Sequence, residues 1–180
     1  LDEDPGIYAV WNMAAKMATG KYLTNANLDD RKAPNSIERH ALELYLSPDA
    51  DLVYSNMLIT HKPNETFENN SSNGERYDFP DFSFENLLRG NMPHASPMWR
   101  KTVHDEHGYF EEKYRSAADW EMWLRAASKG SVFKKFSDVV GLYYFNPTGM
   151  STNPEHDGWK RKEEIEIFKK YQKLFMSQEK

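Results

Sequence analysis

Residues 6–30 read GIYAVWNMAAKMATGKYLTNANLDD, and the order of the elements predicted within them decides the fold. Apolar residues from Ile7 to Ala18 recur at helical spacing, and Gly20 stands where such a helix is expected to stop. Residues 22–26 are then a strand candidate, and the acidic loop 27–30 follows them directly. Because ligands of α/β folds bind outside the carboxyl ends of strands, this loop is in position to form a site.

The rest of the chain predicts further helices and strands of one α/β domain over residues 1–180. The spacing of apolar residues predicts helices at 34–45, 84–88, 97–107, 120–130 and 157–177, and strands at 51–59, 132–136 and 139–145. Residues 61–81 are polar and predict a loop or an irregular hairpin. The apolar faces expected for the second and the last helix are Ile37, Ala41, Leu44 and Tyr45, and Ile165, Phe168, Tyr171 and Phe175.

The overall composition excludes several classes of protein. The 180 residues are 39% apolar and carry a net charge of −5, which does not fit the basic face of a nucleic-acid-binding protein. The sequence has no cysteine, so it offers neither disulfides nor thiolate chemistry. No apolar run approaches the roughly 18 residues that indicate a transmembrane helix.

Asp29 and Asp30 are the first candidates for chemistry. Adjacent carboxylates at the end of a strand suit Mg²⁺ or Mn²⁺, which prefer oxygen ligands and keep some of their waters. Such an ion would neutralise a diphosphate leaving group. The alternative is that residues 27–30 are only a polar turn, since Asn and Asp are common in turns.

Asp119 is the second candidate, because it lies just before the amphipathic helix predicted from Trp120 onward. In one interpretation its side chain is an N-cap that satisfies backbone N–H groups of the helix. In the other, the helix dipole keeps the carboxylate ionised, and the carboxylate accepts a proton from a bound hydroxyl. The two roles do not exclude each other.

Two loops supply further candidates. His94 falls in a loop between Pro93 and Pro97, where it either lines a site or lies on the surface. Residues 146–153 are rich in Asn, Thr, Gly and Ser and follow a predicted strand. Loops of this kind close over substrates or simply connect elements at the surface, and the sequence leaves both interpretations open.

Several segments, in their order along the chain, resemble the motifs of family 2 glycosyltransferases. The resemblance covers about residues 5–153. The matching segments are GIYAVWN at 6–12 with ATGKYL at 18–23, NLDD at 27–30 in the place of the acidic D-x-D region, MWR at 98–100 with GYF at 108–110, ADWEMWLR at 118–125, and 143–151.

The resemblance implies a fold and a reaction. The fold would be a GT-A-type, Rossmann-like α/β sandwich with a mostly parallel sheet flanked by helices. The reaction would be inverting transfer of a sugar from a nucleotide-diphosphate donor to a hydroxyl acceptor, with Mn²⁺ or Mg²⁺ as cofactor. Asn27, Asp29 and Asp30 would hold the donor diphosphate, with the metal on Asp29 and Asp30, and Asp119 would be the general base. We place His94, Trp120 and Asn146 at the acceptor or in a loop beside it.

Three positions depart from the family pattern. Asn27 replaces the first acidic residue of the D-x-D region, Ala118 replaces the acidic residue before the base, and Asn146 stands where a His is common. The family's N-terminal nucleotide-binding strands are also missing, so we expect a fragment with exposed apolar surface, which favours self-association.

The partners implied are a nucleotide-sugar donor and a saccharide or lipid-linked acceptor of polysaccharide or glycoconjugate synthesis. No nucleic acid is expected. The resemblance implies a cytoplasmic location, with peripheral contact at the inner face of the membrane and a homo-oligomer as further options. The departures keep a second hypothesis open, in which the chain is a non-catalytic carbohydrate-binding or assembly module on a degenerate transferase scaffold.

Overall fold

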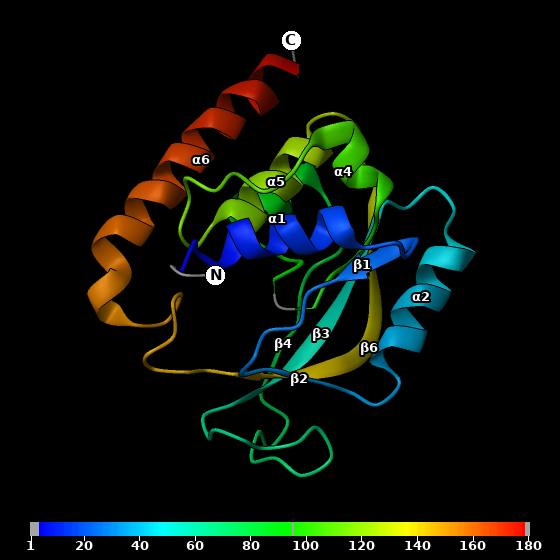
Figure 1. The fold of residues 1–180 in the computed structure, drawn as a ribbon, viewed down its shortest axis with the longest axis vertical. Helices are drawn as coiled ribbons and strands as arrows, with labels where there is room; N and C mark the ends of the chain where they lie inside the picture. The colour runs from blue at the N-terminus through cyan, green and yellow to red at the C-terminus, as the bar shows by residue number, and fades with distance from the viewer. Residues whose placement is uncertain (1–3, 95, 179–180) are drawn as a thin grey trace.

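The structure is a computed structural model, and it describes residues 4–94 and 96–178. Figure 1 shows a twisted sheet with helices packed on both of its faces. The elements are α1 Ile7–Met17, β1 Tyr22–Thr24, β2 Arg31–Lys32, α2 Ser36–Leu46, β3 Leu52–Thr60, β4 Arg76–Tyr77, α3 Phe84–Arg89, β5 Met98–Arg100, α4 Thr102–His107, α5 Ala118–Ala127, β6 Phe133–Tyr144, a 3-10 turn Pro154–His156, and α6 Asp157–Gln178. The expected α/β class is therefore confirmed.

The sheet is mixed, so the expectation of a mostly parallel sheet was wrong. Its order is β1-β5-β3-β6-β2, with β4 paired to β3. Only the β3–β6 pair is parallel among the described strands, and the other pairs are antiparallel. The expectation came from the family resemblance, whereas the short strand β5 lies between β1 and β3 and is antiparallel to both, and the short edge strand β2 is antiparallel to β6.

The strand directions nevertheless place three carboxyl ends at one edge of the sheet. β1 is antiparallel to β5, and β5 is antiparallel to β3, so β1 and β3 run in the same direction. β6 is parallel to β3. The segments that follow β1, β3 and β6 therefore leave the sheet on the same side, where α/β proteins bind ligands.

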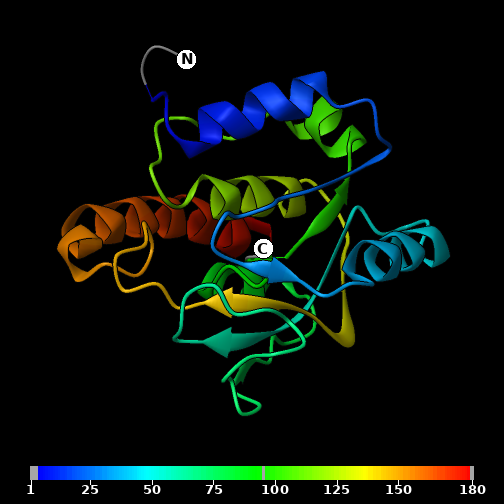
Figure 2. The same cartoon turned by 60° about the horizontal axis from the view of Figure 1, so that its bottom comes forward.

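The two faces of the sheet are covered unequally. Because side chains alternate along a strand, Leu52 and Tyr54 of β3 join the larger core cluster, while Val53 joins a smaller one with Leu44 of α2. Figures 1 and 2 show α2 alone on its face, with α1, α3, α4, α5 and α6 on the other. Trp123 of α5 lies fully within the larger cluster.

Two helices bury only part of the apolar faces that were predicted for them. In α2 the inward residues are Ser36, His40 and Leu44, while Ile37 and Tyr45 are 51% and 75% exposed. His40 turns inward, where its two ring nitrogens lie 2.7 and 2.9 Å from the carbonyl oxygens of Ser36 and Ser96; burial lowers its pKa, and the single N–H of the uncharged ring donates to one of these oxygens. A count of apolar residues alone cannot reveal such a polar anchor.

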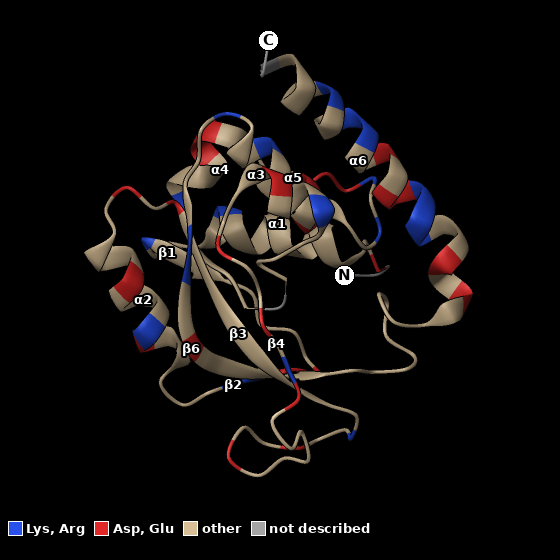
Figure 3. Ribbon diagram, turned by 180° about the vertical axis from the view of Figure 1, so that it is seen from behind, with Lys and Arg blue, Asp and Glu red and all other residues tan. Residues whose placement is uncertain are grey.

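The last helix, predicted at 157–177, forms as α6, and most of its predicted apolar stripe turns inward: Tyr171 is buried, Phe168 packs against the larger core cluster, and Phe175 stacks on Phe84. Ile167 and Tyr171 are buried, whereas the predicted Ile165 is 43% exposed. Figure 3 shows acidic and basic residues interspersed along the ribbon of α6. No helix in residues 4–94 and 96–178 has the length and the low polarity that crossing a membrane requires.

Two further element predictions need correction. The helix expected at 97–107 is split into β5 and α4, because residues 98–100 pair with β1 and β3. The two strands expected at 132–136 and 139–145 are one strand, β6. The pairing of β3 with β6 shifts between Ser55 and Asn56, opposite residues 137 and 138, and this irregularity explains why the sequence indicates a break.

Candidate active site

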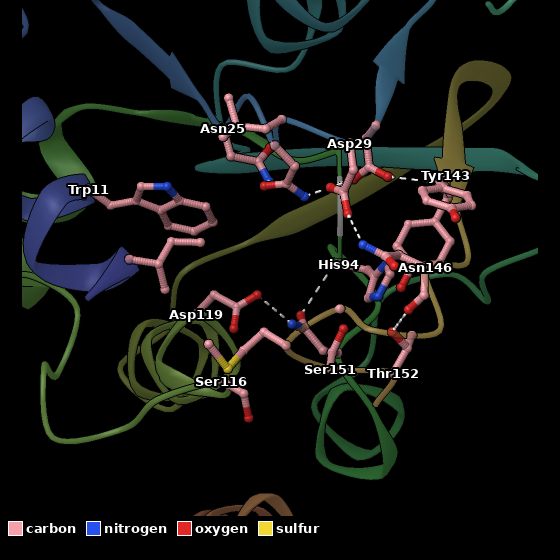
Figure 4. Close-up of a pocket in the computed structure, with 18 of the residues that line it drawn as sticks. Trp11, Asn25, Asp29, His94, Ser116, Asp119, Tyr143, Asn146, Ser151 and Thr152 are labelled. Atoms are coloured by element: carbon pink, nitrogen blue, oxygen red, sulfur yellow. Dashed lines mark hydrogen bonds between the residues drawn. The ribbon is translucent and has the colours of Figure 1, made fainter. Parts of the chain in front are cut away.

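A cleft of about 500 Å³ opens where the carboxyl ends of β1 and β6 meet the first turn of α5. Asp29 and Asp119 both line it, and Figure 4 shows them on opposite sides of the same space. Of the other predicted residues, Asn27, Asp30, His94 and Asn146 also line this cleft. The sheet topology thus brings together side chains from distant parts of the chain.

Asp30 is a structural residue in this cleft rather than a free ligand. Its Oδ1 accepts a hydrogen bond from the backbone N–H of Tyr144 at 3.1 Å, and its Oδ2 accepts one from Asn27 Nδ2 at 2.8 Å. Burial raises the pKa of Asp30, while these hydrogen bonds act in the opposite direction. The carboxylate therefore attaches the acidic loop to the end of β6.

Asp29 is the acidic side chain of this loop that is available to a ligand. It is exposed at the cleft, and its Oδ2 accepts a long hydrogen bond of 3.4 Å from Asn146 Nδ2. The Asn146 Oδ1 accepts from the backbone N–H of Thr148, which shapes the turn after β6. The segments after β1 and β6 therefore face each other across this part of the cleft, as their shared direction requires.

The side chains that line the cleft decide how the expected metal ion could be bound. Among the described residues no group of three or more His, Cys, Asp or Glu side chains is placed to hold an ion. One carboxylate at Asp29 still fits Mg²⁺ or Mn²⁺, because such ions are often bound by one or two carboxylates, with waters and substrate phosphates completing the shell. The arrangement thus suits an ion that arrives with a diphosphate better than one held by protein alone.

Asp119 is not an N-cap, so that interpretation was wrong. The helix begins one residue earlier, at Ala118, and its N-cap residue Ala117 makes no side-chain capping bond. Asp119 is half-buried, and it accepts hydrogen bonds from the Tyr8 hydroxyl at 2.9 Å and from Asn91 Nδ2 at 2.7 Å. Burial raises the pKa of this carboxyl above its ordinary value, which suits a general base.

His94 is enclosed by aromatic rings at the cleft wall. The ring centroids of Tyr143, Tyr77 and Phe79 lie 5.0, 5.3 and 6.3 Å from that of His94. Burial lowers the pKa of His94 to about 4, so the ring is neutral at physiological pH. Its Nδ1 is buried and has no hydrogen-bond partner in the described structure. The backbone of His94 is left-handed, with φ of 30°, which is uncommon outside glycine.

Trp120 belongs mainly to the core. It is 8% exposed, and its indole N–H donates to the carbonyl oxygen of Leu87 at 2.7 Å. Its remaining surface lines a second cleft of about 330 Å³. Arg89, Lys160 and Glu164 line the same cleft. Trp120 therefore offers this cleft only a small part of its surface.

The two clefts share Asp119. They also have Asn91, His94, Ser116 and Ser151 in common. The segment leading into Asp119 is fixed from α6, because Glu163 accepts the backbone N–H groups of Arg115 and Ser116 at 2.8 and 3.1 Å. The carboxylate of Asp119 therefore lies where the first cleft, lined by Asp29, meets the second cleft, lined by Arg89, Lys160 and Glu164.

Tyr8, Trp11 and Asn91 are cleft residues that the sequence did not reveal. Trp11 reads only as part of the apolar stripe of a helix, and Tyr8 only as one residue of the segment 6–12; Figure 4 shows Trp11 at the cleft. Tyr8 is separated from Asp119 by 111 residues in the chain, so no local pattern connects them. A Tyr and an Asn at these places give no signal of their own without the tertiary contact.

No family model matches this chain. Over 174 residues it is 29% identical to the uncharacterized glycosyltransferase YwdF of Bacillus subtilis, covering 92% of this chain and 60% of that protein. Over 151 residues it is 24% identical to the PGL/p-HBAD biosynthesis glycosyltransferase of Mycobacterium bovis, covering 83% and 55%. This chain is similar to glycosyltransferases. It spans somewhat more than half the length of these curated relatives.

Solved glycosyltransferase structures share the fold. The crystal structure of S. aureus TarS 1–349 matches with a TM-score of 0.61 and 18% identity, over 82% of this chain and 42% of TarS. The complex of TarS 1–349 with UDP matches with a TM-score of 0.58 and 17% identity, over 79% and 41%. The mixed sheet and its flanking helices are therefore an arrangement found in a known glycosyltransferase.

Proposed function

We propose that this chain carries the catalytic part of an inverting glycosyltransferase, which moves a sugar from a nucleotide-diphosphate donor to a hydroxyl acceptor. The observation that carries the proposal is the single cleft lined by both Asp29 and Asp119. The similarity to proteins named glycosyltransferases, and the fold shared with TarS, which has been crystallised with UDP, support it.

The two carboxylates have complementary roles in this reaction. The acceptor oxygen attacks the anomeric carbon of the donor, the bond from that carbon to the diphosphate oxygen breaks, and inversion follows from attack on the opposite side. Asp119 takes the proton that the acceptor hydroxyl loses. Asp29 faces the departing diphosphate, and a bound Mn²⁺ or Mg²⁺ would neutralise the charge that develops there.

The remaining predicted residues have supporting roles. Asp30 and Asn27 hold the acidic loop against β6, so that they contribute to the donor side by shaping it. His94 and Asn146 line the wall between the carboxylates, and the second cleft, which Trp120 helps to line, is where a saccharide or lipid-linked acceptor would approach Asp119.

The donor side of the proposal is tested by nucleotide binding. We expect Asp29→Asn to weaken binding of UDP in the presence of Mn²⁺ by about tenfold or more, since a loss of roughly 1.4 kcal/mol at a charged contact corresponds to that factor. Titration calorimetry with UDP, once with MnCl₂ and once with excess EDTA, measures the effect. Asp105→Asn, an equal change of charge on α4, is the control and should bind as the unchanged chain does.

A second candidate function follows from the use of Asp30 in the fold. Asn27 occupies the first acidic position, and Asp30 accepts hydrogen bonds from Asn27 and Tyr144, so Asp29 is the one carboxylate of this loop left for a ligand. A non-catalytic carbohydrate-binding module would not need a second one. The same titration separates the two functions. Binding of glycans with no response to UDP, GDP or dTDP and metal would support the module and contradict the transferase.

A further inference from the structure

Asp119 is held by two hydrogen-bond donors that come from separate elements. The Tyr8 hydroxyl of α1 donates to Oδ1 at 2.9 Å, and Asn91 Nδ2, two residues after α3, donates to Oδ2 at 2.7 Å. One donor on each oxygen fixes the plane of the carboxylate with respect to both clefts. The backbone N–H groups of Trp120 and Asp119 act on the same carboxylate and also favour its charged form.

Both donors are themselves held in place. The ring of Tyr8 is 6% exposed and packs against Trp11 and Phe110, with centroids 5.6 and 5.8 Å apart. Burial, and then the charge of Asp119, raises the pKa of Tyr8 well above its ordinary value, so its hydroxyl stays protonated. The Asn91 Oδ1 lies 3.4 Å from the backbone N–H of His94, which directs the amide N–H₂ group toward Asp119.

We propose that Tyr8 and Asn91 are positioning residues that keep the Asp119 carboxylate ionised and orient it toward an acceptor hydroxyl. The proposal rests on the function proposed above, in which Asp119 is the base. Hydrogen bonds to the charged form of an acid favour that form. Without them, the burial that already disfavours the charge of Asp119 would be opposed only by the backbone N–H groups of Trp120 and Asp119.

Other charged and titratable groups face the same space. Arg115 precedes α5, Arg89 ends α3, Lys160 and Glu164 lie on α6, and Asp29 stands across the cleft. Asp30 and His94 also line it. All of these groups are unchanged when Tyr8 or Asn91 is replaced. A difference in the titration of Asp119 between variants therefore isolates the contribution of the two donors.

The experiment is an NMR titration of the Asp119 side-chain carboxyl carbon in the 180-residue chain, assigned by comparison with Asp119→Asn. We expect Tyr8→Phe and Asn91→Leu each to raise the pKa of Asp119 by about one unit, since a hydrogen bond to a charged group is worth roughly 1.5 kcal/mol or more. If the leucine does not fit, as the backbone amide spectrum would reveal, Asn91→Ala takes its place.

Matched controls remove similar hydrogen bonds elsewhere. Tyr54→Phe removes a buried hydroxyl that donates to Pro80 at 2.7 Å, and Asn86→Leu removes an amide that donates to Asp81 at 3.0 Å. Neither Tyr54 nor Asn86 lines the two clefts. Both controls should leave the titration of Asp119 unchanged. Equal titration of Asp119 in the unchanged chain and in Tyr8→Phe or Asn91→Leu would overturn the proposal.

The transfer reaction gives a second readout. A general base works only when ionised, so its activity falls as the pH drops through its pKa. Tyr8→Phe and Asn91→Leu should therefore move the acid limb of kcat/KM to higher pH by the same amount as the pKa of Asp119. Full transfer activity in Asp119→Asn would refute the proposed function, yet it would leave the NMR result unaffected, so the two failures can be told apart.

Discussion

Replacement of Asp119 by asparagine is expected to lower the rate of glycosyl transfer by about 10²- to 10⁴-fold, the usual contribution of a positioned acid or base. Asparagine keeps the shape of the side chain but has no proton affinity in the useful range. Binding of the donor should change little, because Asp29 stands on the opposite side of the cleft. The measurement is kcat and KM for the donor, followed through release of the nucleoside diphosphate.

The control for this experiment is Asp105→Asn, the same change of charge on α4, at a residue that lines neither cleft. We expect it to retain most of the rate. An Asp119→Asn variant with near-normal turnover would mean that another group takes the proton, and the assignment of the base would then be wrong. A large rise in the donor KM with an unchanged kcat would instead indicate that Asp119 contacts the donor.

Replacement of Glu121 by glutamine is expected to lower the free energy of unfolding by about 3 kcal/mol, the typical cost of breaking a buried charge network. The Glu121 carboxylate is fully buried on α5. It accepts hydrogen bonds from Tyr171 at 2.6 Å, from Lys170 at 2.9 Å and from Arg125 at 2.9 Å. Urea unfolding measures the change, and the variant leaves Arg125 without its buried counter-charge.

The pH dependence of this loss has a definite sign. Burial alone would raise the pKa of Glu121, but the hydrogen bonds from Tyr171, Arg125 and Lys170 outweigh it, so the folded pKa lies below the ordinary value of 4.5. The stability that Glu121 contributes is therefore present above about pH 4.5 and is lost as the pH falls through the lower, folded pKa. The difference between Glu121→Gln and the unchanged chain should shrink in that acidic range.

Glu166→Gln is the matched control on α6. Glu166 pairs with Lys113 at 2.9 Å, and both side chains are more than half exposed, so this pair should contribute little to stability. A loss in Glu166→Gln as large as that in Glu121→Gln would show that burial is not what makes the Glu121 network important.

The parts of the site that depend on the order of neighbouring elements in the chain could be predicted from the sequence. A strand followed by NLDD, in an α/β pattern, places Asp29 at a ligand-binding edge, and the structure lines the cleft with it. The segment after β6 reaches the same edge, since β1 and β6 share a direction. These predictions depended on element order, which apolar spacing largely reveals.

The parts that depend on tertiary contacts could not be predicted. Two adjacent aspartates look equivalent in the sequence. In the structure both oxygens of Asp30 accept hydrogen bonds, from Tyr144 and Asn27, while Asp29 faces the cleft. Tyr8 and Asn91 become meaningful only when α1 and the segment after α3 pack beside α5. Antiparallel pairing of short edge strands likewise follows from long-range contacts rather than from local propensity.

The two hydrogen bonds from Glu163 to the backbone of Arg115 and Ser116 have a consequence for engineering. Helix α6 supports the polypeptide immediately before Asp119, the proposed general base, although the cleft that Asp119 shares with Asp29 contains no residue of that helix. Chimeras that exchange this helix between related sequences therefore have to preserve an acidic side chain at that position. Otherwise an exchange made outside that cleft would disturb the segment that leads into Asp119.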